Sequence, residues 1–333
     1  MNRRRFIANA TAATVGVSAG GVATVMGGGG DTGSKPRVRF GLVADPHFAR
    51  PATGRTGSRF YADSAEKLRE AIRVFNARKL DFVVELGDFK DMDPKPDRRR
   101  ALAYLEEIES ILRTFHGPVF HVLGNHDQDC ISKDDFLART CNGAGTGDGK
   151  TFYAFAVGGV KFVVLDANFR PDGVPYANGN FDWREAFVPA HELRWLRAEL
   201  DCAAPVVVLA HQRLDKFHAR TAFDRALVVR NAAEVRAVLE RNGNVLVVFQ
   251  GHDHRGALTK TNGIHYYTQR GMIEGAYPQN NSFSIGEIFA DGRVRVTGFR
   301  NAVSCELSRS TGGGRARWKE KAAAVVAVAS GCR

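Results

Sequence analysis

Apolar runs bounded by polar residues recur along the chain and predict its buried strands and its helices. Five runs rich in Val, Leu and Phe predict strands over residues 38–44, 82–86, 119–123, 206–210 and 245–250. Apolar residues at helical spacing predict four helices: one begun at Asp63 or Ser64 with Glu66 completing a capping box, one over residues 97–115, one from Pro189 and one from Asn231. Because helices alternate with strands, the pattern predicts an α/β fold with parallel pairing.

The middle and the end of the chain predict a second sheet. Residues 151–157 and 160–166 flank Gly158-Gly159, a spacing typical of a two-residue β-hairpin. Period-two alternation predicts strands that extend an antiparallel sheet over residues 264–268, 283–289 and 293–299. Residues 168–188 are polar and rich in Gly, Pro and aromatic residues, and they predict either a substrate-binding loop or a plain surface loop.

The polar residues that follow the five buried runs are mostly of metal-binding types. They form the clusters Asp45-Pro46-His47, Gly87-Asp88-Phe89-Lys90-Asp91, Gly124-Asn125-His126-Asp127, Ala210-His211-Gln212 and Gly251-His252-Asp253-His254. Each cluster alone is compatible with a turn, a helix cap or a loop pair. Because the carboxyl ends of strands in open α/β sheets form the ligand crevice, we expect the clusters to converge. Their carboxylates and imidazoles suit a pair of metal ions bridged by one carboxylate.

A net charge of +11 can indicate an anionic macromolecular partner, but the distribution of this charge along the chain argues against one. Residues 1–36 and 309–333 carry eight of these charges, and the body has no long basic run beyond Arg98-Arg99-Arg100. We therefore expect no nucleic-acid partner. A content of 44% hydrophobic and 25% charged residues excludes disordered and fibrous classes for the body.

The five cysteines show no CxxC spacing and predict no zinc or redox motif. Cys130 and Cys141 flank one loop and can pair in an oxidising compartment. Free buried thiols are the alternative, and the sequence does not choose between them.

The N-terminus resembles a twin-arginine export signal. Asn2-Arg3-Arg4-Arg5-Phe6-Ile7 precedes an uncharged stretch of Ala, Gly, Thr and Val over residues 10–30. This implies a periplasmic or extracellular protein. A membrane anchor is the alternative, but the stretch is Gly-rich and interrupted by Thr and Ser, so we expect membrane contact only through the signal. Residues 1–36 are assigned to the signal and a linker, and residues 308–333 to a basic, flexible C-terminal tail.

The five clusters match, in order, the motifs D-x-H, G-D-x-x-D, G-N-H-D/E, H and G-H-x-H, so the chain resembles the calcineurin-like metallophosphoesterase superfamily. The likeness runs from about Arg39 to His254. It implies an α/β fold of the four-layer α/β/β/α sandwich type, in a metallophosphoesterase domain over residues 37–307.

The resemblance also implies a role for each motif residue. One metal ion is expected on Asp45, His47 and His254, the other on Asn125, His211 and His252, with Asp88 bridging them. His126 is expected to meet the substrate phosphate and protonate the leaving oxygen, with Asp91 orienting its imidazole. Asp127 is expected to be structural.

Differences from other groups of the superfamily indicate which group this chain resembles most. Asp91 stands where purple acid phosphatases have a metal-binding tyrosine, and Met92-Asp93-Pro94 stands where protein Ser/Thr phosphatases have arginine and glycine. Residues 40–45, 61–76 and 86–88 look like the manganese-dependent ADP-ribose/CDP-alcohol diphosphatase group and its exported bacterial relatives. Residues 178–183 also fit relatives that are described as phosphatases.

These features predict a dinuclear-metal phosphoesterase. The expected cofactors are two divalent or transition metal ions, such as Mn, Fe or Zn, and a hydroxide that bridges them is expected to attack a phosphate ester or phosphoanhydride. The expected partner is a small phosphorylated substrate such as a nucleotide diphosphate derivative. The alternatives are a cyclic-nucleotide or other phosphodiesterase with the same centre, and a non-catalytic metal-binding scaffold. Candidates for phosphate or base contacts, or else ordinary surface and packing residues, are Arg55, Arg59, Arg213, Phe181 and Trp183.

Overall fold

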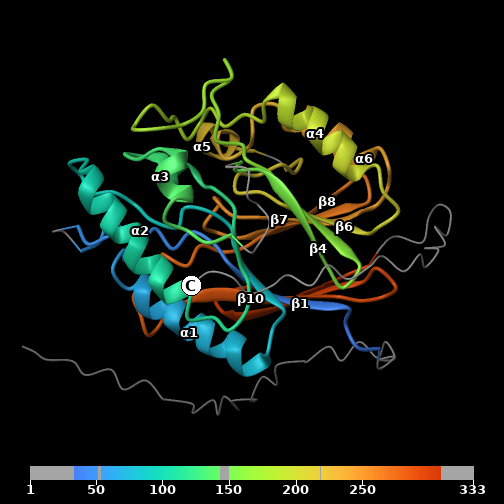
Figure 1. The fold of residues 1–333 in the computed structure, drawn as a ribbon, viewed down its shortest axis with the longest axis horizontal. Coiled ribbons are helices and arrows are strands. Elements are labelled where there is room, and N and C mark those ends of the chain that lie inside the picture. The colour runs from blue at the N-terminus through green and yellow to red at the C-terminus, as the bar shows by residue number, and fades with distance from the viewer. Residues whose placement is uncertain (1–33, 52–53, 143–149, 218, 309–333) are drawn as a thin grey trace, which may run out of the picture. The chain divides into compact units, whose positions relative to one another are not determined.

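Two six-stranded mixed sheets pack face to face in the computed structural model of the protein (Figure 1). The structure describes residues 34–51, 54–142, 150–217 and 219–308. The predicted export signal and C-terminal tail lie outside the described residues, apart from residues 34–36 and 308. Within the described ranges, no helix has the length and apolarity that a membrane crossing requires.

The first sheet joins strands from both ends of the domain in the order β12-β11-β10-β1-β2-β3. Strands β1 to β3 pair in parallel, whereas β10 pairs antiparallel with β1 and continues into an antiparallel edge. The strands are β1 (Val38–Val43), β2 (Phe82–Glu85), β3 (Val119–His121), β10 (Ser282–Ile288), β11 (Val294–Arg300) and β12 (Cys305–Leu307).

The second sheet has the order β4-β5-β6-β7-β9-β8. Its strands are β4 (Tyr153–Val157), β5 (Val160–Val164), β6 (Val206–Leu209), β7 (Val245–Gln250), β8 (Ala257–Thr261) and β9 (Ile264–Thr268). The β4–β5 hairpin confirms the predicted turn, because Gly158 and Gly159 adopt positive φ angles of 60° and 76°.

The prediction for the last strands was only partly right. Strand β9 pairs in parallel with β7 in the second sheet, whereas β10 and β11 cross to the first sheet. Period-two alternation marks a strand but carries no information on which sheet it joins, because any half-buried strand shows the same pattern.

Helices cover the outer face of each sheet and complete the four layers. On the first sheet lie α1 (Ser64–Arg78) and α2 (Arg98–Leu112), and on the second lie α4 (Ala190–Leu200) and α6 (Ala232–Glu240) (Figure 1). Three short helices stand in loops, namely η1 (Asn125–Gln128), α3 (Lys133–Leu137) and α5 (Ala222–Ala226). The predicted four-layer α/β/β/α sandwich is confirmed.

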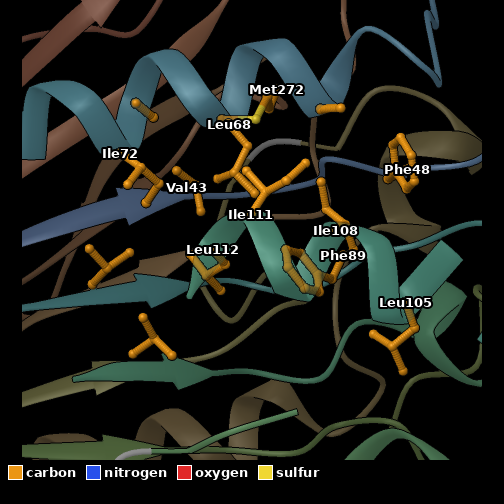
Figure 2. Close-up of a cluster of buried hydrophobic side chains, with 14 of the residues drawn as sticks. Val43, Phe48, Leu68, Ile72, Phe89, Leu105, Ile108, Ile111, Leu112 and Met272 are labelled. Carbon is orange, nitrogen blue, oxygen red and sulfur yellow. The ribbon is translucent and has the colours of Figure 1, made fainter. Parts of the chain in front are cut away.

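Three apolar clusters fill the spaces between the four layers. Strand β1 shows how alternation sorts the side chains, because Phe40 and Leu42 face the second sheet while Val43 faces the helices. In Figure 2, Leu68 and Ile72 of α1 lie among the side chains of the helix-facing cluster. Burial of this kind contributes about 25 cal/mol for each Å² of apolar surface removed from water.

The helix caps differ in part from the prediction. Asp97 caps α2 by accepting a hydrogen bond from Arg100 N at 3.1 Å, but Asp63 forms no side-chain cap on α1. Instead, the Asp63 carboxylate accepts a hydrogen bond from Tyr277 N at 2.9 Å. A tertiary contact has therefore taken the place of the predicted capping box. In addition, Cys130 is a free thiol, so the Cys130–Cys141 disulfide is not formed.

Candidate metal centre

The five polar clusters lie together at the carboxyl ends of strands from both sheets. The loops that carry them follow β1 (Asp45, His47), β2 (Asp88, Asp91), β3 (Asn125, His126), β6 (His211) and β7 (His252, His254). Most of these side chains are fully buried, while His126 and His254 are partly exposed. The structure therefore brings every predicted site residue to one place.

Asp88 lies between two sets of potential ligands. Its Oδ2 atom lies 3.4 Å from His47 Nε2 and 3.2 Å from His211 Nε2, and its Oδ1 accepts a hydrogen bond from His126 N at 2.7 Å. Four groups of the described side chains bring potential ligand atoms within 4.8 Å of one another, namely Asp45 with His47 and His254, His47 with Asp88 and His126, Asp88 with His211 and His252, and Asp91 with His126 and Asp129. Asp88 therefore has the position that a bridging ligand requires.

Several polar atoms at this centre lack the partners that buried groups normally have. The side-chain oxygen and nitrogen of Asn125 and the Nε2 atom of His252 are buried without a hydrogen-bond partner among the described residues. His47 Nε2 and His254 Nε2 face each other at 3.1 Å. An unsatisfied buried polar group costs about 1–3 kcal/mol. Divalent ions would satisfy these carboxylate, imidazole and amide atoms, so the residues fit such ions.

Three of the imidazoles are fixed from behind, which leaves their Nε2 atoms directed at the centre. Such contacts set the tautomer of a metal-binding histidine and orient its ring. The pairs are His254 Nδ1 with Glu274 Oε1 at 2.7 Å, His47 Nδ1 with Asp91 Oδ2 at 3.1 Å, and His211 Nδ1 with Leu86 O at 2.7 Å.

The backbone at the centre is held in an unusual conformation. Asp45, His47, Asp88 and His252 have φ angles of 53°, 44°, 54° and 66°, in the left-handed region that non-glycine residues rarely adopt. Each such residue costs about 1–3 kcal/mol. Backbone hydrogen bonds compensate, because Asp45 N donates to Gly87 O and His47 N donates to Asp88 O. The strain is concentrated at residues of the centre, as it commonly is at functional sites.

Two loops of the first sheet approach each other too closely for a side chain between them. A Cβ atom on Gly124 would lie 2.1 Å from Asp88 N and 2.3 Å from its Oδ1. The Asp127 carboxylate joins the loops by accepting hydrogen bonds from the N–H groups of Gly124, Asp88, Phe89 and Lys90. These contacts agree with the structural role expected for Asp127.

His126 stands beside the ligand groups with its ring held by carboxylates. Its Nδ1 lies 3.2 Å from Asp91 Oδ1, and the other oxygen of Asp91 faces His47. Asp129 lies behind the same ring, with its Oδ2 3.8 Å from His126 Nδ1, and forms a buried ion pair with Lys90. With Nδ1 engaged in this way, Nε2 is the ring nitrogen left to act on a substrate.

The charges around His126 favour its protonated form. Burial alone would lower the pKa of His126, but Asp91 and Asp88 raise it well above its usual value. Burial alone would raise the pKa of Asp88, but the imidazoles of His211, His126 and His47 hold it well below its usual range. The pKa of Asp91 is likewise lowered, against the effect of burial, by His126 and His47. The centre therefore combines ionised carboxylates with a proton donor.

The sequence did not identify the residues that support the ligands from outside the motifs. Glu274 belongs to no motif and lies 20 residues beyond His254, so no spacing pattern marked it. Asn168 Nδ2 donates to Leu123 O at 2.6 Å, and Gln212 Nε2 donates to Asn168 Oδ1 at 2.7 Å. Asn168 thus links the loops that carry Asn125 and His211. In the sequence, only its position at the start of the predicted loop of residues 168–188 pointed to a role for Asn168.

The arginines proposed for phosphate binding fall into two classes. Arg213 is buried and engaged, because it donates to Asp215 at 2.9 and 2.6 Å and to Asp253 at 2.7 Å. Its guanidinium is therefore a structural ion-pair partner. Arg55 is exposed and Arg59 is partly exposed, and both remain candidates for a phosphate contact.

The loop of residues 168–188 borders the centre. The Phe181 ring lies 5.6 Å from the His126 ring, and the Trp183 ring lies 6.2 Å from the His252 ring, measured between centroids. This location favours the first of its two predicted roles, a substrate-binding loop.

Known proteins are similar to this chain in sequence. A family model described as calcineurin-like phosphoesterase matches residues 38–256. A protein named manganese-dependent ADP-ribose/CDP-alcohol diphosphatase from Arabidopsis thaliana is 24% identical over 309 residues, which cover 81% of this chain and 96% of that protein. A protein of the same name from Danio rerio is 26% identical over 319 residues, covering 78% of this chain and 97% of the relative.

Solved structures resemble this fold. A dimetal phosphatase from Danio rerio has a TM-score of 0.69 at 24% identity, covering 83% of this chain and 100% of the other. A purple acid phosphatase from yellow lupin has a TM-score of 0.52 at 14% identity, covering 79% of this chain and 51% of the other. At these identities the likeness shows the fold alone.

Proposed function

The chain belongs to the calcineurin-like phosphoesterase family, a family of metal-dependent phosphoester hydrolases, and from this premise we propose that it hydrolyses the diphosphate bond of nucleoside diphosphate derivatives at a centre of two divalent ions. One observation carries the proposal: Asp88 lies between His47 and His211, and the His126 ring stands beside this carboxylate with its Nδ1 engaged. The names of the relatives from Arabidopsis thaliana and Danio rerio support the substrate class and manganese as the metal.

The ligand atoms divide naturally between two ions. Asp45, His47 and His254 would hold one, and Asn125, His211 and His252 the other, with Asp88 shared. When bound, such ions lower the pKa of water from about 15.7 towards 7 and neutralise phosphoryl oxygens. Oxygen and nitrogen donors without thiolates suit manganese as well as zinc and iron.

The residues of the chain then serve the leaving group. The Nε2–H of protonated His126 donates a proton to the leaving oxygen as its bond to phosphorus breaks. Asp91 holds the imidazole through Nδ1 and stabilises its positive charge, so the proton is delivered from a fixed position. Burial of the surrounding carboxylates excludes water from the ligand sphere and strengthens these interactions.

A substrate panel tests the proposal. The full chain, loaded in turn with Mn, Zn, Fe or Co, is assayed with ADP-ribose, CDP-choline, cyclic AMP and simple phosphate monoesters. We expect the highest kcat/KM with ADP-ribose or CDP-choline and manganese. A higher kcat/KM with cyclic AMP would replace this function by the phosphodiesterase alternative, and absence of turnover with every substrate and metal would favour the non-catalytic scaffold.

We further propose that residues 1–36 export the folded enzyme by the twin-arginine route. The support is the Arg3-Arg4-Arg5 run before an uncharged stretch. Fusing residues 1–36 to a reporter that folds in the cytoplasm should deliver the reporter to the periplasm. Replacement of the three arginines by lysine should retain the reporter in the cytoplasm, and export that survives this replacement would contradict the route.

A further inference from the structure

Two aromatic side chains, Trp183 and Phe223, form a wall beside His252 at the metal centre. Trp183 lies next to His252, and its ring is also 5.6 Å from the ring of Phe223, tilted by 56°. Phe223 is 55% exposed, which makes it one of the few large apolar side chains open to solvent among the described residues. The rings of His252, Trp183 and Phe223 thus form a row that ends at the solvent. The exposed Phe223 ring is therefore in a position to contact a substrate.

The short helix that carries Phe223 is tied to the metal-binding loop. Arg255 Nη2 donates to Asp224 Oδ1 at 3.0 Å, and Arg255 Nε donates to Asp253 Oδ1 at 2.7 Å. Asp253 stands between the ligands His252 and His254 in the chain. Arg255 therefore fixes the position of α5 relative to the centre, so that Phe223 is preorganised rather than free to move.

The loop that carries Trp183 is anchored as well. Tyr176 is fully buried, and its hydroxyl donates to Asp182 O at 2.6 Å. Glu185 pairs with Arg230 through both carboxylate oxygens. These contacts flank Trp183 on both sides in the chain and hold the wall against the centre.

We infer that Trp183 and Phe223 form the subsite that stacks the base of a nucleotide substrate, an inference that rests on the proposed function. Stacking of a base on an aromatic side chain is worth about 1–3 kcal/mol and tolerates every base, because each base has a π-face. Both adenine and cytosine derivatives are therefore accepted.

The charges around the wall distinguish a base from the other group that aromatic rings bind well, a quaternary ammonium. The guanidinium carbon of Arg184 lies 5.2 Å from the Trp183 ring, and that of Arg255 lies 5.9 Å from the Phe223 ring. These cations already occupy the vicinity of the rings and repel a second cation. The choline of a CDP-alcohol is therefore directed away from the wall.

The two aromatic contacts of the loop also orient the substrate. Trp183 lies against His252, whereas Phe181 lies against His126, the donor to the leaving oxygen. His252 and His126 each lie close to Asp88, but in different groups of neighbouring side chains. With its base at Trp183, the nucleoside phosphate is the part that is attacked, and the non-nucleoside phosphate leaves. Water then adds its oxygen to the nucleoside phosphorus, and the broken bridge oxygen takes its proton from His126.

Kinetics of Phe223→Ala and Trp183→Ala test the subsite. The readout is the ratio of kcat/KM for ADP-ribose to kcat/KM for P1,P2-dimethyl diphosphate, which has no base. We expect this ratio to fall about tenfold to a hundredfold in each variant, as loss of a stacking contact implies. Trp183→Phe, which keeps an aromatic face, should restore most of the ratio. Val303→Ala, at a 61% exposed position in the turn between β11 and β12, is the matched control.

A second readout uses water labelled with oxygen-18. We expect the label in the AMP formed from ADP-ribose, and label in ribose 5-phosphate would overturn the inferred orientation. An unchanged ratio in Phe223→Ala, which contacts no metal ligand directly, would overturn the subsite while leaving the proposed function intact. By contrast, a wild-type chain that cleaves no diphosphate at all would overturn the proposed function itself.

Discussion

At the scale of single residues, the centre depends on side chains that touch a ligand rather than the metal. Glu274 accepts from His254 Nδ1 at 2.7 Å, and this contact leaves Nε2 as the ring nitrogen that would bind a metal ion. The hydrogen bond to His254 lowers the pKa of Glu274 to about 2, although burial acts to raise it. Glu274 is therefore an ionised partner that raises the basicity of the imidazole.

We expect Glu274→Gln to lower metal affinity about tenfold to a hundredfold, the usual effect of losing such a partner. The measurement is calorimetric titration of the metal-free chain with Mn(II). Glu306→Gln, at a half-exposed site on β12, is the matched control. Equal affinity in Glu274→Gln and the control would show that the contact does not orient His254.

His126 is proposed to act on the leaving group and is not assigned as a ligand. We expect His126→Ala to retain its metal ions, measured by elemental analysis, and to lose about 10²–10⁴ in kcat with an alkyl phosphate, whose alkoxide leaving group needs a proton. With p-nitrophenyl phosphate the loss should be much smaller, because nitrophenolate leaves without protonation. Equal losses with the two substrates would contradict the role of proton donor.

At the scale of elements, the loops after β2 and β3 form one unit. Gly124 leaves room for Asp88, and Asp127 binds four backbone N–H groups of the two loops. The position of the bridging carboxylate is therefore set by backbone contacts between neighbouring loops.

We expect Gly124→Ala to displace Asp88, because the added Cβ would lie 2.1 Å from its backbone nitrogen. The result should be loss of stoichiometric metal and of activity in a chain whose far-ultraviolet circular dichroism is unchanged. Gly173→Ala is a stringent control for glycine replacement, because Gly173 has a positive φ of 83°, unlike Gly124 with its φ of −96°, and no atom of the described residues lies within 4 Å of its Cβ position. Normal metal content in Gly124→Ala would contradict this account.

At the scale of the whole domain, the ligands join two sheets. Asp45 and Asp88 follow strands of the first sheet, whereas His211 and His252 follow strands of the second. Metal ions that bind this set stabilise only the folded state, by an amount that grows with ligand concentration. We expect removal of metal by a chelator to lower the midpoint of thermal unfolding by several degrees, and excess Mn(II) to restore it. An unchanged midpoint would contradict ligation across the sheets.

A buried charge cluster couples stability to pH away from the centre. His121 lies 3.1 Å from Glu109 and 3.3 Å from Glu85. Burial would lower the pKa of His121, but Glu109 and Glu85 raise it to about 10. Burial raises the pKa of Glu85 to about 8. The folded chain thus binds more protons than the unfolded chain, and this contribution falls as pH rises.

We expect His121→Gln to cost about 3–5 kcal/mol near pH 6, because the change removes the buried cation that lies between Glu109 and Glu85. The stabilisation by His121 is complete below its ordinary pKa of 6.5 and is lost as pH rises through about 10, so the difference from wild type should shrink towards pH 10. Denaturant unfolding at several pH values measures it. A difference that stays constant or grows with pH would contradict the assignment.

The sequence by itself determined most of the strands, the main helices and the motif residues of the centre, but it did not mark the edge strands β8 and β12. Apolar runs such as 38–44 and 245–250 mark buried strands because burial requires local hydrophobicity, and the motif residues follow them directly. Strand ends converge in α/β sheets, so the predicted site residues could be placed together before any coordinates were known.

Only the tertiary structure decided which distant groups support those residues. Glu274, Asn168 and the wall of Trp183 and Phe223 come from segments whose local patterns are those of ordinary loops and helices. The same holds for Asp63, whose carboxylate binds a distant backbone group, and for β9, which joins a sheet in parallel. The local periodicity of a segment depends on which of its faces is buried, so the sequence shows it. These contacts depend instead on how the layers pack against each other, which the residues next to them in the sequence do not indicate.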